Sequence, residues 1–400
     1  GRLTGLGPCD DLPPTLDVGA SEMASTGSEK RTPANGIRPN GLTRRQALAG
    51  GAAATAAGTL AAPALAQAPR TLRLVGTFPR GFPGLGQSSE WFADRVNAMA
   101  DGSLTVEYFG GGELVPPFGV NDAVSAGTAE IGHTAPYFAV KKIPSTMYFT
   151  TFPYGLSQSE LSGWINFGGG QELWDEAYAP FKLKPLYGGG SMAQAGGWFK
   201  QPIESLADLE GLKMRIGGLG GEVMKRVGVE PVNLPPTQIF EALESGTVDA
   251  AEFVGPWNDL ALGLYTVAPY YYLTSFAEPG PALEFIINLD VWDDLSAPHK
   301  AIIAAAAGAV ADEFTSAFAY HNARRLTQLV ERGAIISSFP AEVIAAIGTA
   351  SREAIEAYPA GDPMSEKIHD GYFAYVRECA RCGAAMEGQM LVDRGAVWAE

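Results

Sequence analysis

The fold is decided by residues 211–256, "GLKMRIGGLGGEVMKRVGVEPVNLPPTQIFEALESGTVDAAEFVGP". A strand ends at Arg215, residues 219–235 read as a helix followed by a strand, and residues 235–256 read as a helix followed by another strand. Such alternation predicts parallel α/β architecture. The last strand carries Glu252 among apolar residues, where an uncompensated carboxylate would be very costly.

A similar pattern occurs earlier, where residues 71–138 read as strand, helix, strand, helix and short strand. "VNDAVSAGTAEIGHT" (120–134) and "IFEALESGTVDAAEF" (239–253) both read as a helix, a turn containing Gly-Thr and a strand with one late polar residue. This weak internal similarity predicts two similar lobes. After residue 296 the signals are helical, and the last helix, within 363–395, has apolar residues on more than one face, as a helix that packs on another subunit would.

The composition is that of a globular protein large enough for two domains, with 400 residues of which 46% are hydrophobic and 18% charged. A net charge of -16 argues against a nucleic-acid partner, which requires a basic surface. Two of the three cysteines, Cys379 and Cys382, form a C-x-x-C motif in a helical stretch with no second pair. The motif is open to a redox or metal role, but two helical thiols one turn apart are the simpler interpretation.

Residues 42–68 have the pattern of a Tat-type export signal. Arg44 and Arg45 precede a short run of Ala, Gly and Leu, and Ala66-Gln67-Ala68 supplies a small-x-small cleavage site. We therefore expect cleavage after Ala68 and a periplasmic mature protein, although a disordered alanine-rich leader is the alternative. Residues 1–41 are expected to be disordered, and Met23 is a plausible start.

Enzyme signatures are absent from the sequence, which contains neither H-E-x-x-H nor the phosphate-binding G-x-x-x-x-G-K-[ST]. "GGGSMA" (188–193) approaches the nucleophile elbow G-x-S-x-G around Ser191, but Ala193 replaces the final glycine. His133, at a strand end, is better explained as a structural histidine than as a base.

Three polar residues do stand where a ligand site is expected, because the carboxyl ends of strands in open α/β folds face the ligand crevice. Arg215 and Glu252 end strands, and Gln194 lies in a glycine-rich approach to one. A guanidinium can bind a carboxylate with two hydrogen bonds, and oxygens from Gln194, Glu252 and a backbone carbonyl could hold a hard cation. Two alternatives remain: a plain buried salt bridge between Arg215 and Glu252, and a Gln194 that only bridges backbone groups.

The sequence also resembles a known family. The matching stretches are "FPGLG" (82–86), "EIGHTAPYF" (130–138), "GGGQELWDEAYAPF" (168–181), "QAGGWF" (194–199), "GLKMRIGGLGGEVMKRVGVEPVNLP" (211–235), "IFEALESGTVDAAEFVGPWNDLALGLY" (239–265) and "EPGPALE" (278–284). Together they resemble the DctP-type solute-binding proteins of TRAP (tripartite ATP-independent periplasmic) transporters, in the branch that binds 2-oxo acids such as pyruvate, or lactate with calcium. The resemblance covers nearly all of residues 69–400.

The resemblance implies roles for individual residues. Arg215 matches the arginine that binds the ligand carboxylate, and Gln194 and Glu252 match side-chain ligands of a sodium or calcium ion. Phe253 stands where the branch often has Trp, and its backbone carbonyl would be a further metal ligand. Glu278 matches a carboxylate near the far end of the ligand. Tyr137, Phe138 and Trp257 are candidates for the pocket wall.

The family fold implied is two α/β lobes joined by hinge strands and a long connecting helix, with a helical C-terminal extension. Lobe one would comprise residues 69–192 and 281–320, and lobe two residues 193–280 and 321–355. The helices of 356–400 would allow a homodimer.

A small monocarboxylate would be delivered to membrane permease subunits without catalysis. The alternatives are a sensor that binds a different organic acid with the same fold, and, less favoured, a lyase or hydrolase that uses Glu252 as a base.

Overall fold

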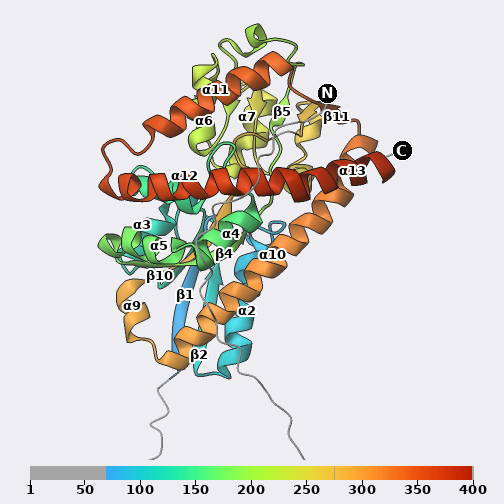
Figure 1. The fold of residues 1–400 in the computed structure, drawn as a ribbon. Helices are drawn as coiled ribbons and strands as arrows, with labels where there is room; N and C mark the ends of the chain where they lie inside the picture. Colours follow the sequence, from blue (N-terminus) through green and yellow to red (C-terminus); the bar gives the residue numbers. More distant parts are fainter. Residues whose placement is uncertain (1–68, 274, 399–400) are drawn as a thin grey trace, which may run out of the picture. The chain divides into compact units, whose positions relative to one another are not determined.

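A computed structural model of the chain describes residues 69–273 and 275–398. The predicted leader and the predicted Tat signal, residues 1–68, lie outside the described residues. Two β-sheets, one for each lobe, organise the described part of the chain (Figure 1).

The first sheet, sheet A, has five strands in the order β2-β1-β3-β10-β4. Their bounds are β1 (Arg70–Gly76), β2 (Leu104–Phe109), β3 (Ile131–Thr134), β4 (Leu183–Gly190) and β10 (Ala282–Asn288). β1 pairs in parallel with β2 and β3, whereas β10 runs antiparallel to both β3 and β4. Every residue of β10 is buried, as is usual for a strand inside a sheet covered on both faces.

The second sheet, sheet B, has six short strands in the order β11-β9-β5-β8-β6-β7. They are β5 (Gly197–Phe199), β6 (Lys213–Arg215), β7 (Glu230–Val232), β8 (Ala250–Ala251), β9 (Tyr270–Tyr272) and β11 (Ile335–Ser337). β6 pairs in parallel with β7 and β8, and β5 is antiparallel to β8 and β9.

The prediction of parallel sheets was therefore only partly right, because each sheet is mixed. β5 follows β4 along the chain and enters sheet B from sheet A, and β10 returns from sheet B to sheet A. Each of these strands joins its new sheet in the opposite direction to its neighbours. The strands of the two sheets fall within the residue ranges predicted for the two lobes. The exact lobe boundaries stay a prediction.

The helices surround the two sheets. They are α2 (Gln87–Ala100), α3 (Val120–Ser125), α4 (Gln158–Phe167), α5 (Gly170–Tyr178), α6 (Gly218–Arg226), α7 (Ile239–Ser245), α8 (Pro256–Leu262), α9 (Leu289–Asp294), α10 (Ala297–Glu331), α11 (Ala341–Ala357), α12 (Pro363–Gly383) and α13 (Gln389–Trp398). The short turn η2 (Pro136–Ala139) follows β3, and one π-helical turn, η8 (Ala384–Gly388), joins α12 to α13 without a break.

The long helix α10 begins at a Ser296 cap and contacts elements of both lobes, namely α2 and β4 on one side and α8 on the other (Figure 1). By length and composition alone, α10 is the one helix among the described residues that could cross a membrane. Its apolar residues have another explanation, since Ile303, Val310, Phe314 and Phe318 are fully buried in the protein core.

Candidate functional site

Arg215 is the last residue of β6, and its position follows from the strand pattern, in which Lys213 is exposed while Met214 and Arg215 are buried. The backbone N–H of Glu252 donates to the carbonyl oxygen of Arg215 at 2.8 Å, so the ends of β6 and β8 lie together. Arg215 Nη1 donates to Glu252 Oε2 at 3.1 Å and also to the Glu252 backbone carbonyl. The predicted salt bridge therefore exists, with both side chains nearly fully buried.

The salt bridge between Arg215 and Glu252 leaves hydrogen-bonding atoms of both side chains outside the pair. Glu252 Oε1 is buried and has no hydrogen-bond partner among the described residues. Arg215 Nε donates to the carbonyl of Leu234 at 3.3 Å, which holds the guanidinium from behind. Burial and the nearby Glu278 carboxyl raise the pKa of Glu252 well above its ordinary value, against the opposite effect of Arg215. One guanidinium does not compensate the carboxylates of this site.

Glu278 is the second buried carboxyl group, in the loop between β9 and β10, with 3% of its surface exposed. Burial raises the pKa of Glu278 to about 7, although Arg215 and Tyr137 act in the opposite direction. A Cβ atom on Gly217 would lie 3.5 Å from the Tyr137 hydroxyl and 3.7 Å from Glu278 Oε1, which places these two polar groups at the start of α6. Glu278 Oε2 is buried and has no partner among the described residues.

Gln194 is joined to Glu278 through the backbone, because its N–H donates to the Glu278 carbonyl at 3.1 Å. Its side-chain Nε2 donates to Ser191 Oγ at 3.0 Å, which fixes the amide orientation and leaves Oε1 as an acceptor. Gln194 Oε1 is also buried without a partner among the described residues. The alternative in which Gln194 only bridges backbone groups does not account for this oxygen.

The three buried oxygens without partners, one each on Gln194, Glu252 and Glu278, fit a hard cation, since sodium-like and calcium-like ions take oxygen ligands from carboxylates, amides and carbonyls. Residues 69–273 and 275–398 contain no group of three His, Cys, Asp or Glu side chains suited to a metal. This does not conflict with the fit, because an amide and a backbone carbonyl complete the set of oxygens.

A small cavity of about 30 Å³ lies at this cluster. Its polar lining comes from Arg215, Gln194, Glu278, Ser191 and Tyr137, and its apolar lining comes from Phe78, Leu85, Ala135, Phe138, Pro236, Phe253, Val254, Pro281, Ala282 and Leu283. The Phe253 ring lies 5.7 Å from the guanidinium carbon of Arg215. Residues from the ends of strands in both sheets therefore enclose a space with one charged end and apolar walls.

A larger cleft of about 650 Å³ adjoins the cavity and shares Tyr137, Phe138 and Arg215 with it. The structure places Arg215, Gln194, Glu278, Tyr137, Phe138 and Phe253 around the cavity. Glu252 does not line the cavity itself but is joined to it through its ion pair with Arg215. Trp257 does not line the cavity. Trp257 is the second residue of α8, and its indole stacks on His321 at 4.2 Å and packs edge-on against Phe318, both on α10. Its large apolar surface serves the packing of α8 on α10.

Two residues that position the site are not recognisable as such from the sequence. Ser191, noticed only as an incomplete nucleophile motif, holds the Gln194 amide. Asp259 is fully buried and accepts hydrogen bonds from Trp198 Nε1 and the Tyr271 hydroxyl, both at 2.9 Å, and from Val254 N at 3.4 Å. It thereby fixes the segment that follows Glu252. The sequence signal that could have indicated Asp259 is a carboxylate two residues after Trp257 in "GPWNDL" (255–260).

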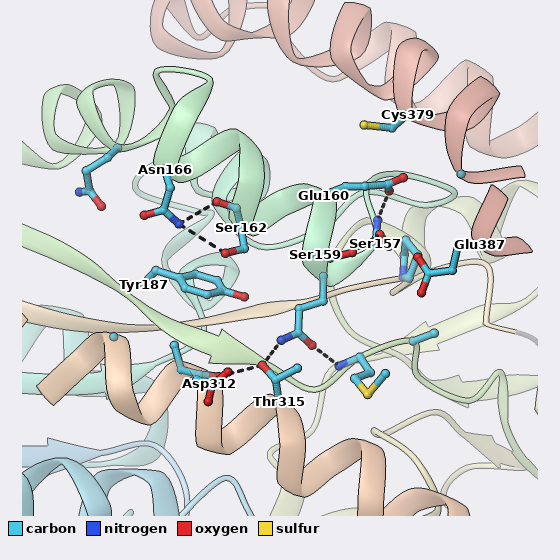
Figure 2. Close-up of a pocket in the computed structure, with 18 of the residues that line it drawn as sticks. Ser157, Ser159, Glu160, Ser162, Asn166, Tyr187, Asp312, Thr315, Cys379 and Glu387 are labelled. Carbon is cyan, nitrogen blue, oxygen red and sulfur yellow. Dashed lines mark hydrogen bonds between the residues drawn. The ribbon is translucent and has the colours of Figure 1, made fainter. Parts of the chain in front are cut away.

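A hollow larger than the cavity and the cleft lies elsewhere, a groove of about 880 Å³ between α4, α10 and the helix α12–α13. Figure 2 shows Glu160, Asp312, Thr315, Tyr187 and Glu387 around it. None of the predicted site residues lines this groove. Size alone therefore does not identify the ligand site, and the buried unpaired oxygens do.

Two α/β lobes, a shared long helix and a charged cavity between strand ends define a solute-binding protein of the periplasmic type. The chain belongs to the DctP family, bacterial extracellular solute-binding protein family 7, whose model matches residues 79–360. Similar solved structures are TRAP-transporter solute-binding proteins, and the resemblance found in the sequence is confirmed.

A monocarboxylate 2-oxoacid-binding periplasmic protein of Nostoc sp. is 36% identical over 306 residues, which are 76% of this chain and 84% of the relative. A TRAP solute-binding protein from Bordetella bronchiseptica is 32% identical, with a TM-score of 0.80 over 82% of this chain and 98% of its own. It is a mixed-occupancy dimer with calcium and picolinate in one active site. One from Pseudoalteromonas atlantica, with bound sodium and pyruvate, is 34% identical, with a TM-score of 0.78 over 80% and 98% of the two chains.

Proposed function

We propose that this chain captures a small monocarboxylate, a 2-oxo acid such as pyruvate or the hydroxy acid lactate, and delivers it to the membrane permease subunits of a TRAP transporter. Arg215 would bind the carboxylate of the solute. A sodium or calcium ion would bridge the solute to Gln194, Glu252 and the backbone carbonyl of Phe253. The chain would bind and release the solute without chemical turnover.

The observation that carries this proposal is the set of buried oxygens without partners on Gln194, Glu252 and Glu278 beside a single guanidinium. Two carboxylates and one arginine leave an excess of negative charge, and an anionic solute would add more. A bound cation removes that repulsion and supplies electrostatic attraction to the solute's oxygens. The ions and acids named for the related structures are of the same chemical kinds.

The lining of the cavity also suits a solute of this kind, because its walls beyond the charged end are apolar. A short acid with one charged end and a methyl or ethyl tail matches a cavity that has one charged end and apolar walls. The relatives' names are those of periplasmic proteins and support a periplasmic location. We propose that this location is reached through the Tat-type signal of residues 42–68, with cleavage after Ala68.

A homodimer formed through the C-terminal helices is part of the proposal. The end of the described chain exposes apolar side chains, namely Met386, Met390, Leu391, Val392, Val397 and Trp398. The adjoining groove contains the small residues Ala304, Ala307, Gly308 and Ala311 of α10, which would allow a helix to approach closely. A second copy of this chain would cover both surfaces.

The proposal is tested by a thermal-shift screen of residues 69–400 after exhaustive dialysis against a chelator. Pyruvate, 2-oxobutyrate, longer 2-oxo acids, lactate and a sugar control would each be added with and without sodium or calcium. A ligand at a hundred times its Kd adds about 2.7 kcal/mol to the free energy of unfolding, which is easily detected. A shift that requires both acid and cation is expected. No shift with any carboxylate in the presence of cation would contradict the substrate assignment.

A further inference from the structure

We propose that Phe138 sets the upper size limit of the solute, so that the site accepts acids with a short tail and rejects those with a long or aromatic tail. This inference rests on the proposed function, because it concerns the same cavity. It adds a specificity-determining residue and restricts the substrate class to acids whose tail ends within the inner cavity.

The first observation is that two hollows of very different size meet at a partition, which is formed by the side chains that line both. The inner cavity holds about 30 Å³ and the outer cleft about 650 Å³. Among the described residues, three side chains line both: Tyr137, Phe138 and Arg215. A solute bound at Arg215 that is too long for the inner cavity would have to extend past these side chains into the cleft.

Of the three residues in the partition, only Phe138 would exclude a long solute by the shape of its side chain alone. Arg215 is held by its ion pair with Glu252, and it is the group that would bind the solute. Tyr137 presents its hydroxyl near Glu278 and is part of the polar lining. Phe138 has no polar side-chain atom, so shortening it removes volume from the partition without leaving an unsatisfied hydrogen-bonding group.

Phe138 is also held in place. Its ring lies 4.8 Å from the Tyr137 ring in an edge-on arrangement and 4.9 Å from the Phe118 ring. Its backbone N–H donates to the carbonyl of Ala135 at 3.1 Å within the turn η2. Aromatic contacts on two sides disfavour rotation of the ring out of the partition. A long solute therefore meets a fixed obstacle.

Beyond Phe138 the cleft could receive an apolar tail. Its lining includes Phe118, Val140, Ile143 and Phe181. Removing the Phe138 ring would join this apolar wall to the inner cavity. Each methylene that then enters an apolar environment adds about fourfold to affinity, so a tail of several carbons gains more than tenfold.

The test compares Phe138→Ala with the wild-type protein by titration calorimetry, with the cation present throughout. The probes are pyruvate, 4-methyl-2-oxopentanoate and phenylpyruvate. The matched control is Phe167→Ala, which removes the same atoms from a phenylalanine at the end of α4 that is 94% exposed and lines neither hollow. The wild-type protein and the control are expected to bind pyruvate at least about tenfold more tightly than phenylpyruvate.

In Phe138→Ala we expect phenylpyruvate affinity to rise at least tenfold and pyruvate affinity to fall. Phe138→Leu, which keeps most of the packing, should gain affinity for 4-methyl-2-oxopentanoate, and it decides the matter if the alanine variant does not fold. A wild-type protein that binds all three acids equally, or folded variants with the wild-type order of affinities, would overturn the inference and leave the proposed function intact. A wild-type protein that binds no acid would overturn both.

Discussion

Arg215 and Glu252 form a buried ion pair at the meeting point of two parallel strands, with 3.1 Å between Nη1 and Oε2. The same nitrogen also donates to the Glu252 backbone carbonyl. A buried ion pair is weak evidence for stability, because removing both charges from water costs about as much as their attraction returns. The ion pair is better explained by binding, because some of its polar atoms are free to contact a ligand. Glu252 Oε1 has no partner among the described residues, and the guanidinium faces the cavity.

Replacing Arg215 is predicted to abolish acid binding. Arg215→Ala removes the charge that would bind the solute carboxylate, a loss of about 2–5 kcal/mol of binding free energy for a buried charge pair. It also leaves Glu252 unpaired, which should lower the free energy of unfolding by about 3–5 kcal/mol. Arg215→Lys keeps the charge but not the two-pronged geometry, and should weaken binding while preserving the fold. Titration calorimetry and melting curves measure the two effects, and micromolar affinity in Arg215→Ala would remove Arg215 from the site.

Glu252→Gln is predicted to remove the dependence of binding on cation. The amide has the same shape but no charge, so the oxygen set would hold a hard cation much more weakly. Acid binding should become weak and insensitive to added sodium or calcium. Asp249→Asn, at an exposed position on the same segment outside the cavity, is the control. The check is the melting temperature with acid, before and after chelator, and an unchanged response to chelator would make Glu252 purely structural.

The stability of the cation-free protein is predicted to fall as pH rises through the acidic range. Burial raises the pKa of Glu278 from its ordinary value of 4.5 to about 7. Between these values Glu278 holds a proton in the folded state that it has lost in the unfolded state, so its contribution to the free energy of unfolding decreases with rising pH up to about 7 and then levels off. A cation bound beside Glu278 favours the ionised form of this carboxyl group. Its stabilising effect should therefore be largest above pH 7 and small near pH 5.

Two variants separate the contributions to this pH dependence, measured as melting temperature between pH 5 and 8.5. Glu278→Gln should flatten the pH dependence of the cation effect. Glu284, a buried carboxyl in β10 whose pKa burial raises to about 8, lies outside the cavity. Glu284→Gln should flatten the curve of the cation-free protein and leave the cation effect unchanged. An equal cation effect at pH 5 and 8 would contradict the role of Glu278.

The proposed dimer predicts that charge on the exposed face of the last helix will separate the subunits. Met390→Glu and Trp398→Glu each place a carboxylate on an apolar surface that a second copy would cover. Both should shift the protein from dimer to monomer in light scattering coupled to gel filtration. Phe167→Glu, at a phenylalanine that is 94% exposed and does not line the groove, is the control. A monomeric wild-type protein would contradict the proposal.

The sequence alone determined the family and named most of the side chains that meet at the candidate site. Alternating strand and helix signals gave the α/β class, and the family motifs gave the two-lobed fold. Arg215 and Glu252 could be placed at strand ends because strand signals are local, and parallel strands end at the same edge of a sheet. The same reasoning did not predict the antiparallel direction of β5 and β10. Each of these strands enters its sheet from the other sheet, so its direction depends on the path of the chain between the sheets and not on a local pattern.

Only the tertiary structure decided how residues far apart in the chain share one cavity. Gln194 meets Glu278 through a backbone hydrogen bond that no local pattern predicts. Trp257 turns toward α10 because Phe318 and His321 offer it an aromatic surface there. Phe138 lines both the cavity and the cleft because η2 and the Phe118 ring hold it at that point. Local sequence fixes secondary structure and residue chemistry, whereas the direction of a side chain follows from packing between distant segments.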